Sequence, residues 1–192
     1  ITGASGFIGS HLCEIFVKKG FNVVAFDRYN ISNNYGWLEN SEFKNDIEFI
    51  LGDIRDYDSV QHSLEGVNSV IHMAALIGIP YSYISPLAYL KTNTEGTYNI
   101  LENCRKKESI NQILITSTSE VYGSAQSIPM NENHPINPQS PYAASKSAAD
   151  QLASDAGKVA ENIAGATEAL GEAKSDIGKA LDASIAQAEN AM

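Results

Sequence analysis

The chain has 192 residues, of which 43% are hydrophobic and 19% charged, a composition typical of a globular protein with a buried core. No apolar run approaches the roughly 20 residues that a membrane span needs, so a membrane span is excluded. The formal net charge of -10 leaves no basic face to offset phosphate repulsion, which argues against nucleic acid as a partner. Nucleotides held by backbone amides remain compatible with this charge.

Cysteine and histidine usage bounds the redox setting and the metal chemistry. Cys13 and Cys104 lie far apart, with no CxxC pair and no Cys/His spacing typical of zinc. We therefore predict no metal site and a reduced, cytoplasmic location. No basic segment followed by an apolar one opens the chain, which argues against secretion. His72 ends an apolar run and is predicted to be a packed, hydrogen-bonded core residue.

From residue 1 to about residue 116, short β-branched or aromatic runs alternate with helical stretches, which is the pattern of a parallel α/β sheet. A full strand is expected before the first helix, but only Ile1 and Thr2 precede the glycines. The chain therefore either starts inside its first strand or lacks that strand. The predicted strands are Asn22 to Asp27, Ile47 to Leu51, Ser69 to His72 and Gln112 to Thr116. The predicted helices are Phe7 to Lys19, Tyr57 to Leu64 and Leu87 to Lys107, and Ser117 to Pro141 is predicted to be a proline-broken loop.

The composition changes from about Asp155 onward. Alanine dominates, proline and aromatic residues are absent, and apolar residues recur every eleven positions at Val159, Leu170, Leu181 and Met192. An eleven-residue period gives about 3.67 residues per turn, typical of a straight or slightly right-handed helix. We predict an α/β domain over residues 1–153 and an Ala-rich amphipathic helix of unrelated character over residues 154–192.

The segment Thr2-Gly3-Ala4-Ser5-Gly6-Phe7-Ile8-Gly9 carries GxxGxxG between the strand remnant and the first predicted helix. In such a turn the first glycine allows the tight bend, the second lets the backbone approach a pyrophosphate, and the third lets the helix pack close to the sheet. The helix N-terminus then offers amide donors to the phosphates. A purely structural glycine turn is the alternative. The predicted cofactor-binding residues of this turn are Gly3, Gly6, Phe7, Ile8 and Gly9.

Two carboxylates follow the next two predicted strands. Asp27 lies where a dinucleotide fold places a carboxylate on the adenosine ribose. Because a carboxylate repels a 2′-phosphate, we predict NAD rather than NADP, unless Arg28 turns to the phosphate and reverses the preference. Asp53, with Ile54 beside it, is placed to accept from the adenine amino group. The alternatives are a strand-capping Asp27 and an ordinary turn aspartate at position 53.

Tyr142-Ala143-Ala144-Ser145-Lys146 places a phenol and an ammonium four residues apart, on one face of a helix. The Lys146 ammonium favours the phenolate of Tyr142 and can hold a nicotinamide ribose, which makes Tyr142 a usable acid and base near neutrality. YxxxK alone arises often by chance. Together with the glycine turn and Asp27, in this order, it indicates a dinucleotide-dependent enzyme.

Further motifs along the chain complete a family pattern. Residues 1 to about 153 resemble the extended short-chain dehydrogenase/reductase family, closest to the nucleotide-sugar epimerases and 4,6-dehydratases. The resemblance implies a Rossmann-type doubly wound parallel sheet, NAD as cofactor and a nucleotide-diphosphate sugar as substrate; we also expect a homo-oligomer, most simply a dimer. It implies that Ala74, Ala75 and Leu76 line the nicotinamide side, that Asn93 lies near the active site, and that Ser117 and Thr118 end a strand facing the substrate. The motifs that carry the resemblance are TGASGFIG, LGDIRD, HMAA, NTEGTYNIL, STSEVYG and SPYAASK.

Ser119-Glu120 bears on the reaction. Epimerases similar to this chain generally have small or hydroxyl residues where Glu120 stands, whereas loss of water from C6 requires a second proton-transfer group. The pair resembles that of GDP-mannose 4,6-dehydratases rather than the Asp-Glu of dTDP-glucose 4,6-dehydratases. UDP-glucuronate decarboxylases share a similar SEVYG stretch, and residues 74–83 resemble bacterial dehydratases that act on UDP-N-acetylhexosamines for surface polysaccharides.

The implied reaction is redox-neutral. Tyr142, with Thr118 on the sugar O4, takes the C4 hydroxyl proton as hydride leaves; Glu120, directly or with Ser119, removes the C5 proton and helps water leave C6; Lys146 orients Tyr142. The family's substrate region has no counterpart after residue 153, so we expect a fragment or a chimera. A 4-epimerase, a UDP-glucuronate decarboxylase, a non-catalytic NAD-binding module and a partner-binding tail are the alternatives.

Overall fold

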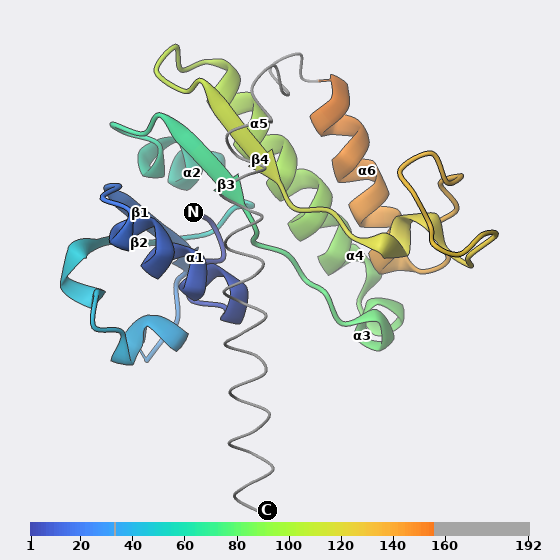
Figure 1. Cartoon of the computed structure of the whole chain (residues 1–192), viewed down its shortest axis with the longest axis horizontal. Helices are drawn as coiled ribbons and strands as arrows, with labels where there is room; N and C mark the ends of the chain where they lie inside the picture. Colours follow the sequence, from blue (N-terminus) through green and yellow to red (C-terminus); the bar gives the residue numbers. More distant parts are fainter. Residues whose placement is uncertain (33, 156–192) are drawn as a thin grey trace, which may run out of the picture.

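The computed structural model describes residues 1–32 and 34–155, and these form a parallel sheet flanked by helices (Figure 1). Strand β1 pairs with β2, and β3 pairs with β4, both in parallel. Thr2 forms a parallel bridge to Phe26 of β1 and another to His72 of β3, so it joins the two pairs. The order across the sheet is therefore β2, β1, the segment at Thr2, β3 and β4. The strands are β1 (Val23–Arg28), β2 (Ile47–Gly52), β3 (Ser69–His72) and β4 (Gln112–Ile115).

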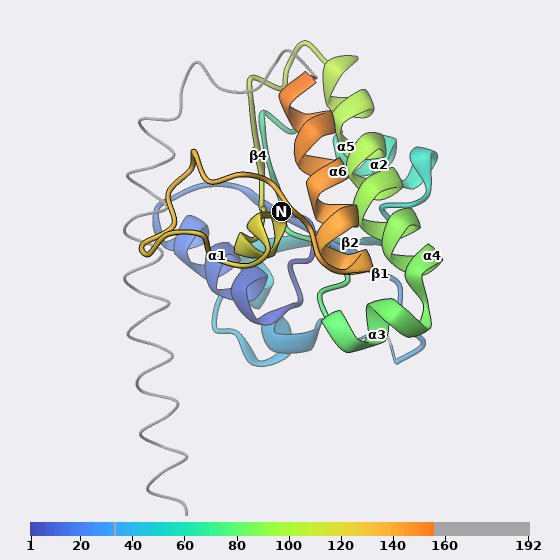
Figure 2. The ribbon, with the colours of Figure 1, turned by 90° about the vertical axis from the view of Figure 1, so that its right-hand side faces the viewer.

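Helices cover both faces of this sheet, as Figure 2 shows with α1 on one side and α2, α5 and α6 on the other. Alternation along β1 explains why both faces are apolar: Val23 and Ala25 pack with Cys13 of α1, whereas Phe26 packs with Val60 of α2 and Ile100 of α5. This arrangement confirms the predicted Rossmann-type α/β fold. The helices are α1 (Phe7–Lys18), α2 (Tyr57–Ser63), α3 (Ile79–Ile84), α4 (Pro86–Tyr89), α5 (Gly96–Arg105) and α6 (Pro141–Asp155).

The predicted single helix from Leu87 to Lys107 is wrong in its middle. Helix α4 passes into a π-helical turn, η3 (Leu90–Glu95), before α5 begins. A π-turn holds one extra residue and is common at functional sites. Here it contains Asn93, whose side chain is bonded to neighbouring segments instead of facing solvent. Helical periodicity in the sequence does not register one inserted residue, and helix α3 was likewise not predicted.

The proline-rich segment between β4 and α6 is a loop, as predicted, apart from one 3₁₀ turn, η4 (Ser119–Tyr122). His134 is buried in it and accepts a hydrogen bond from the Gln126 amide at 2.9 Å. Gly123 has φ +64°, and a Cβ there would meet the Asn137 carbonyl oxygen at 2.2 Å. The loop is thus closed on itself by backbone contact.

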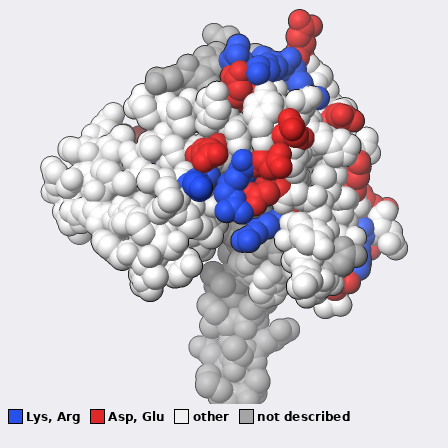
Figure 3. Space-filling view, turned by 180° about the vertical axis from the view of Figure 1, so that it is seen from behind, with Lys and Arg blue, Asp and Glu red and all other residues white. Residues whose placement is uncertain are grey.

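Three sequence predictions concern membranes, metals and the tail. Within the described ranges, no helix is both long and apolar enough to cross a bilayer, and no group of ligand-type side chains there could hold a metal ion. On the face drawn in Figure 3, basic side chains lie next to acidic ones. The Ala-rich helix was predicted over residues 154–192. Its first two residues belong to the end of α6, and residues 156–192 lie outside the described residues.

Candidate active site

The glycine turn is held by backbone contacts that leave no room for side chains. Gly3 has φ +67°, and a Cβ there would lie 2.9 Å from the Ala74 backbone. A Cβ on Gly9 would lie 2.2 Å from the Gly3 carbonyl oxygen, so α1 packs directly on the turn. Gly6 is exposed and caps α1 without a side-chain hydrogen bond. The first-turn amides of α1, among them those of Phe7 and Ile8, therefore receive no side-chain cap from Gly6 and point along the helix axis toward the glycine turn, the geometry that anion binding uses.

Asp27 lies against the glycine turn. One of its carboxylate oxygens accepts a hydrogen bond from the Ser5 amide at 2.6 Å, and the other accepts from the Arg28 amide at 2.6 Å. The structure therefore brings together two segments that the sequence predicted for one cofactor. The Arg28 side chain is exposed at the end of β1.

Asp53 and Ile54 are placed differently from each other. Both carboxylate oxygens of Asp53 accept hydrogen bonds from the Arg55 guanidinium, which holds the pKa of Asp53 below its usual range. The Ile54 side chain is buried in the core, close to Gly96. The Ile54 carbonyl accepts a hydrogen bond from Asn99 Nδ2 at 3.0 Å. Neither the side chain nor the carbonyl of Ile54 is therefore offered to a ligand, and Asp53 already has the intramolecular partner typical of a turn.

The segment after β3 is clamped by Asn93. The Leu76 amide donates to Asn93 Oδ1 at 2.8 Å, and Asn93 Nδ2 donates to the Leu76 carbonyl at 2.9 Å. The same Nδ2 donates to Ser145 Oγ at 2.9 Å, and Ser145 Oγ donates to the Tyr142 carbonyl at 2.7 Å. Asn93 thus links the predicted nicotinamide-side segment, with Ala74 and Ala75, to the beginning of α6. Sequence analysis missed Ser145, although its place inside YxxxK put it on the buried side of the helix.

Tyr142 and Lys146 occupy the first two turns of α6, and both are buried, with exposed fractions of 7% and 5%. The Tyr142 ring meets the Tyr89 ring edge-on, with centroids 6.2 Å apart. Lys146 Nζ donates to the Thr116 carbonyl at 2.6 Å, at the end of β4. Burial lowers the pKa of Lys146, an effect partly offset by the Asp150 carboxylate. Asp150 in turn accepts a hydrogen bond from Ser117 Oγ, which joins α6 to the end of β4 a second time.

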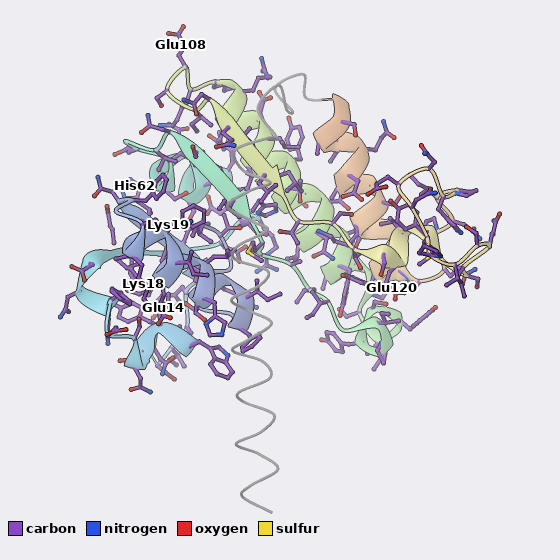
Figure 4. The ribbon with its side chains drawn as sticks, viewed as in Figure 1. Glu14, Lys18, Lys19, His62, Glu108 and Glu120 are labelled. Atoms are coloured by element: carbon purple, nitrogen blue, oxygen red, sulfur yellow. The ribbon has the colours of Figure 1, made fainter. Side chains whose placement is uncertain are left out.

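Thr118, Ser119 and Glu120 form the turn that faces α6. Thr118 Oγ1 accepts a hydrogen bond from the Glu120 amide at 3.3 Å and so caps η4, which packs against α6. Ser119 and Glu120 are exposed. Figure 4 shows Glu120 beside the beginning of α6 and far from the labelled Glu14 and Lys18 of α1. The structure therefore gathers Glu120 with the helix that carries Tyr142 and Lys146.

Comparison with known proteins finds the same family over most of the chain. Residues 1–166 match the family described as GDP-mannose 4,6 dehydratase. A putative UDP-glucose 4-epimerase from Methanocaldococcus jannaschii is 37% identical over 147 residues, covering 76% of this chain and 46% of that protein. A dTDP-glucose 4,6-dehydratase from Streptomyces niveus is 32% identical over 159 residues, covering 80% and 47%.

Solved structures agree with these relatives. The dTDP-glucose 4,6-dehydratase DesIV from Streptomyces venezuelae, with NAD and TYD bound, superposes with a TM-score of 0.71 and 32% identity, covering 79% of this chain and 49% of that one. The UDP-Glc/GlcNAc 4-epimerase from Campylobacter jejuni superposes with a TM-score of 0.72 and 29% identity, covering 81% and 47%. The chain thus spans about half the length of the proteins it matches.

Proposed function

Because the chain belongs to the GDP-mannose 4,6-dehydratase family of NAD-dependent epimerases and dehydratases, we propose that it is the cofactor-binding half of a nucleotide-sugar 4,6-dehydratase. Glu120 is the observation that carries the choice of a dehydratase. It adds an exposed carboxylate on a turn that packs against the helix of Tyr142 and Lys146. Removal of a C5 proton and loss of water from C6 need such a second proton-transfer group, whereas C4 epimerisation does not.

The residues of the glycine turn fit NAD. Gly6 leaves the first turn of α1 open, and the amides of that turn can donate hydrogen bonds to a pyrophosphate without a cationic side chain, as a chain of net charge -10 requires. The Asp27 carboxylate, held by the Ser5 and Arg28 amides, suits the two hydroxyls of an adenosine ribose and would repel a 2′-phosphate. This supports NAD over NADP.

The chain's own residues divide the proton transfers between them. Tyr142 takes the C4 hydroxyl proton, with Thr118 hydrogen-bonded to the sugar O4. Lys146 lies one turn away in the same buried helix, and its positive charge favours the phenolate. NAD, when held by the glycine turn and Asp27, would supply an acceptor for the C4 hydride and, once reduced, a hydride donor for C6. Glu120 removes the C5 proton, which the 4-ketone has made acidic, and with Ser119 it delivers that proton to the C6 hydroxyl, which leaves as water. When C6 regains a hydride, C5 takes up one proton, and the proton that Tyr142 took from the C4 hydroxyl balances it.

Replacing Glu120 by glutamine tests this assignment. The 192-residue chain is titrated with NAD by calorimetry and incubated with dTDP-, UDP- and GDP-hexoses, with the products identified by mass spectrometry. We expect a 4-keto-6-deoxy product that Glu120→Gln loses while its NAD affinity stays unchanged. Glu132 is an exposed acid of the same loop, so Glu132→Gln is the matched control. We expect Glu132→Gln to keep both product formation and NAD affinity. A variant Glu120→Gln that still forms the product would refute the role.

A 4-epimerase is the second candidate, favoured by the 37% identical relative from Methanocaldococcus jannaschii. In that case the same incubations give the C4 epimer, and Glu120→Gln turns over normally. Release of carbon dioxide from UDP-glucuronate would instead identify a decarboxylase. NAD binding without any product from the panel would leave a cofactor-binding module.

We also propose that the chain forms a homo-oligomer in a reducing, cytoplasmic setting. Leu87, Leu90 and Tyr98 expose apolar surface around a hollow of about 460 Å³ on the outer side of α4, η3 and α5, where a second copy could pack. Cys13 and Cys104 are both buried thiols, in keeping with a reducing compartment. Sedimentation of the chain and of Leu90→Glu tests the oligomer, because an unchanged mass of the variant would exclude this face.

A further inference from the structure

Two side chains hold the segment between β3 and α3 at its two ends. At its start, the amides of Met73 and Ala74 both donate to Thr2 Oγ1, at 3.1 Å each. At its end, the amide and carbonyl of Leu76 are bonded to the Asn93 side chain. Thr2 precedes the glycine turn, and Asn93 belongs to the π-turn η3. The segment therefore depends on the spacing between these two clamps.

His72 connects the two clamps through the protein interior. Its Nδ1 lies 2.7 Å from Thr2 Oγ1, and its Nε2 lies 3.0 Å from Thr97 Oγ1. Thr97 Oγ1 donates to the Asn93 carbonyl at 2.6 Å. With the segment Met73 to Leu76, these side chains close a ring of hydrogen bonds. His72 is 2% exposed, while Asn93 and Thr97 are 1% exposed each, so water does not compete with the ring.

Counting protons around the ring assigns the tautomer of His72. Thr2 Oγ1 accepts from two amides, which fills both of its lone pairs, so its single proton is donated to His72 Nδ1. Nδ1 therefore carries no proton, and Nε2 carries it and donates to Thr97 Oγ1. The Thr97 hydroxyl in turn donates its hydrogen bond to the Asn93 carbonyl. In a protonated, imidazolium form of His72, Nδ1 would also carry a hydrogen. That N–H would face the hydrogen of the Thr2 hydroxyl, and this hydrogen bond of the ring would be lost.

We propose that His72, as its neutral Nε2–H tautomer, is a positioning residue that fixes the distance between the glycine turn and the Tyr142 helix. On one side it acts through Thr2, next to Gly3, whose backbone touches Ala74 so closely that no Cβ fits between them. On the other side it acts through Thr97 and Asn93, which reaches Ser145 and the Tyr142 carbonyl. The role in catalysis rests on the proposed function, whereas the ring itself does not.

The tautomer is tested by long-range ¹H–¹⁵N spectra of the 192-residue chain labelled at histidine. His72 is assigned as the signal lost in His72→Gln, and the signal of the exposed His62 is the internal reference. We expect an unprotonated Nδ1 and a protonated Nε2 for His72, unchanged between about pH 5 and pH 8, where an ordinary histidine titrates. A proton on Nδ1, or titration within that range, would overturn the assignment.

Coupling through the ring is tested with Thr97→Val, which removes the hydroxyl at nearly constant shape. We expect the Leu76 amide to exchange with solvent about tenfold faster, and NAD affinity to fall about tenfold, with both restored in Thr97→Ser. Ser63→Ala is the matched control, because Ser63 is also buried and donates to a carbonyl of its own helix, outside the ring. If the Leu76 amide exchanges with solvent at the same rate in Thr97→Val as in Ser63→Ala, the proposed coupling through the hydrogen-bond ring is refuted.

The two readouts separate the ring from the proposed function. Should the parent chain not bind NAD, the proposed function fails, while Leu76 exchange and the His72 spectrum still decide the ring. Should Thr97→Val not fold, the His72 tautomer in the spectrum of the parent chain still tests the hydrogen-bond ring. An unchanged NAD affinity together with faster Leu76 exchange would overturn the coupling to the cofactor site.

Discussion

Replacing Gly9 by alanine places a methyl group where backbone already lies. The added Cβ would be 2.2 Å from the Gly3 carbonyl oxygen and 2.9 Å from Ala4 Cα. Ordinary contact begins near 3.4 Å, so α1 and the glycine turn must separate by 3.4 − 2.2 = 1.2 Å. Overpacking of this kind costs about 3 kcal/mol at its upper end, and the better helix propensity of alanine returns about 1 kcal/mol. We expect a net loss of about 2 kcal/mol in the free energy of unfolding.

Urea unfolding followed by Trp37 fluorescence measures this loss. Trp37 is the single tryptophan, and its ring lies 5.3 Å from that of Phe7 on α1, so it reports on the helix that must move. Gly78→Ala is the matched control, because Gly78 has φ -71° and its nearest outside atom, Tyr89 Oη, lies at 3.4 Å. We expect Gly9→Ala also to weaken NAD binding. Equal unfolding midpoints for the two variants would refute the steric reasoning.

Three further predictions concern charge. Asp27→Asn should raise the ratio of NADP to NAD affinity, measured by calorimetry with both cofactors, and an unchanged ratio would exclude Asp27 as the discriminating group. Burial lowers the pKa of His72 from 6.5 to about 3. The unfolded chain therefore binds a proton that the folded chain refuses, and stability falls by up to about 1.4 kcal/mol per pH unit as pH drops below 6.5 toward 3. His72→Gln should flatten that slope in urea titrations, and an identical slope contradicts the prediction. Lys146→Met removes the desolvation cost of a buried ammonium but also its hydrogen bond to the Thr116 carbonyl, so the free energy of unfolding should change by less than about 2 kcal/mol, while turnover is lost; a larger destabilisation would contradict this.

The spacing of apolar residues predicted a helix or strand well where a single periodicity runs through the whole element. The strand Ser69 to His72 has the predicted bounds, and α1 ends one residue before its predicted end. The same rules failed at η3, because apolar spacing on either side of Asn93 is helical and the extra residue of the π-turn leaves it nearly unchanged. Helix α3 was missed because it is short, begins at a proline-containing turn and exposes most of its apolar side chains.

The chemistry of the candidate site could be predicted from single motifs, because each motif places its functional groups within one turn or one helix. GxxGxxG, Asp27 and YxxxK each state a local requirement: space for phosphate, a carboxylate after a strand, and two groups on one helical face. Their order along the chain indicated a dinucleotide-dependent enzyme, and the further motifs between them identified the family, which the family comparison confirms together with the predicted α/β sheet.

Partnerships between distant residues were decided only by the tertiary structure. Nothing local to His72 shows that Thr2 and Thr97, 70 and 25 residues away, would meet its two ring nitrogens. Nor does the YxxxK motif show that Ser145 would bond to Asn93. Such contacts depend on the order of the strands and on the extra residue in η3, which set how far side chains reach across the core. The sequence thus determined which groups are available for chemistry, while packing determined which of them are held together.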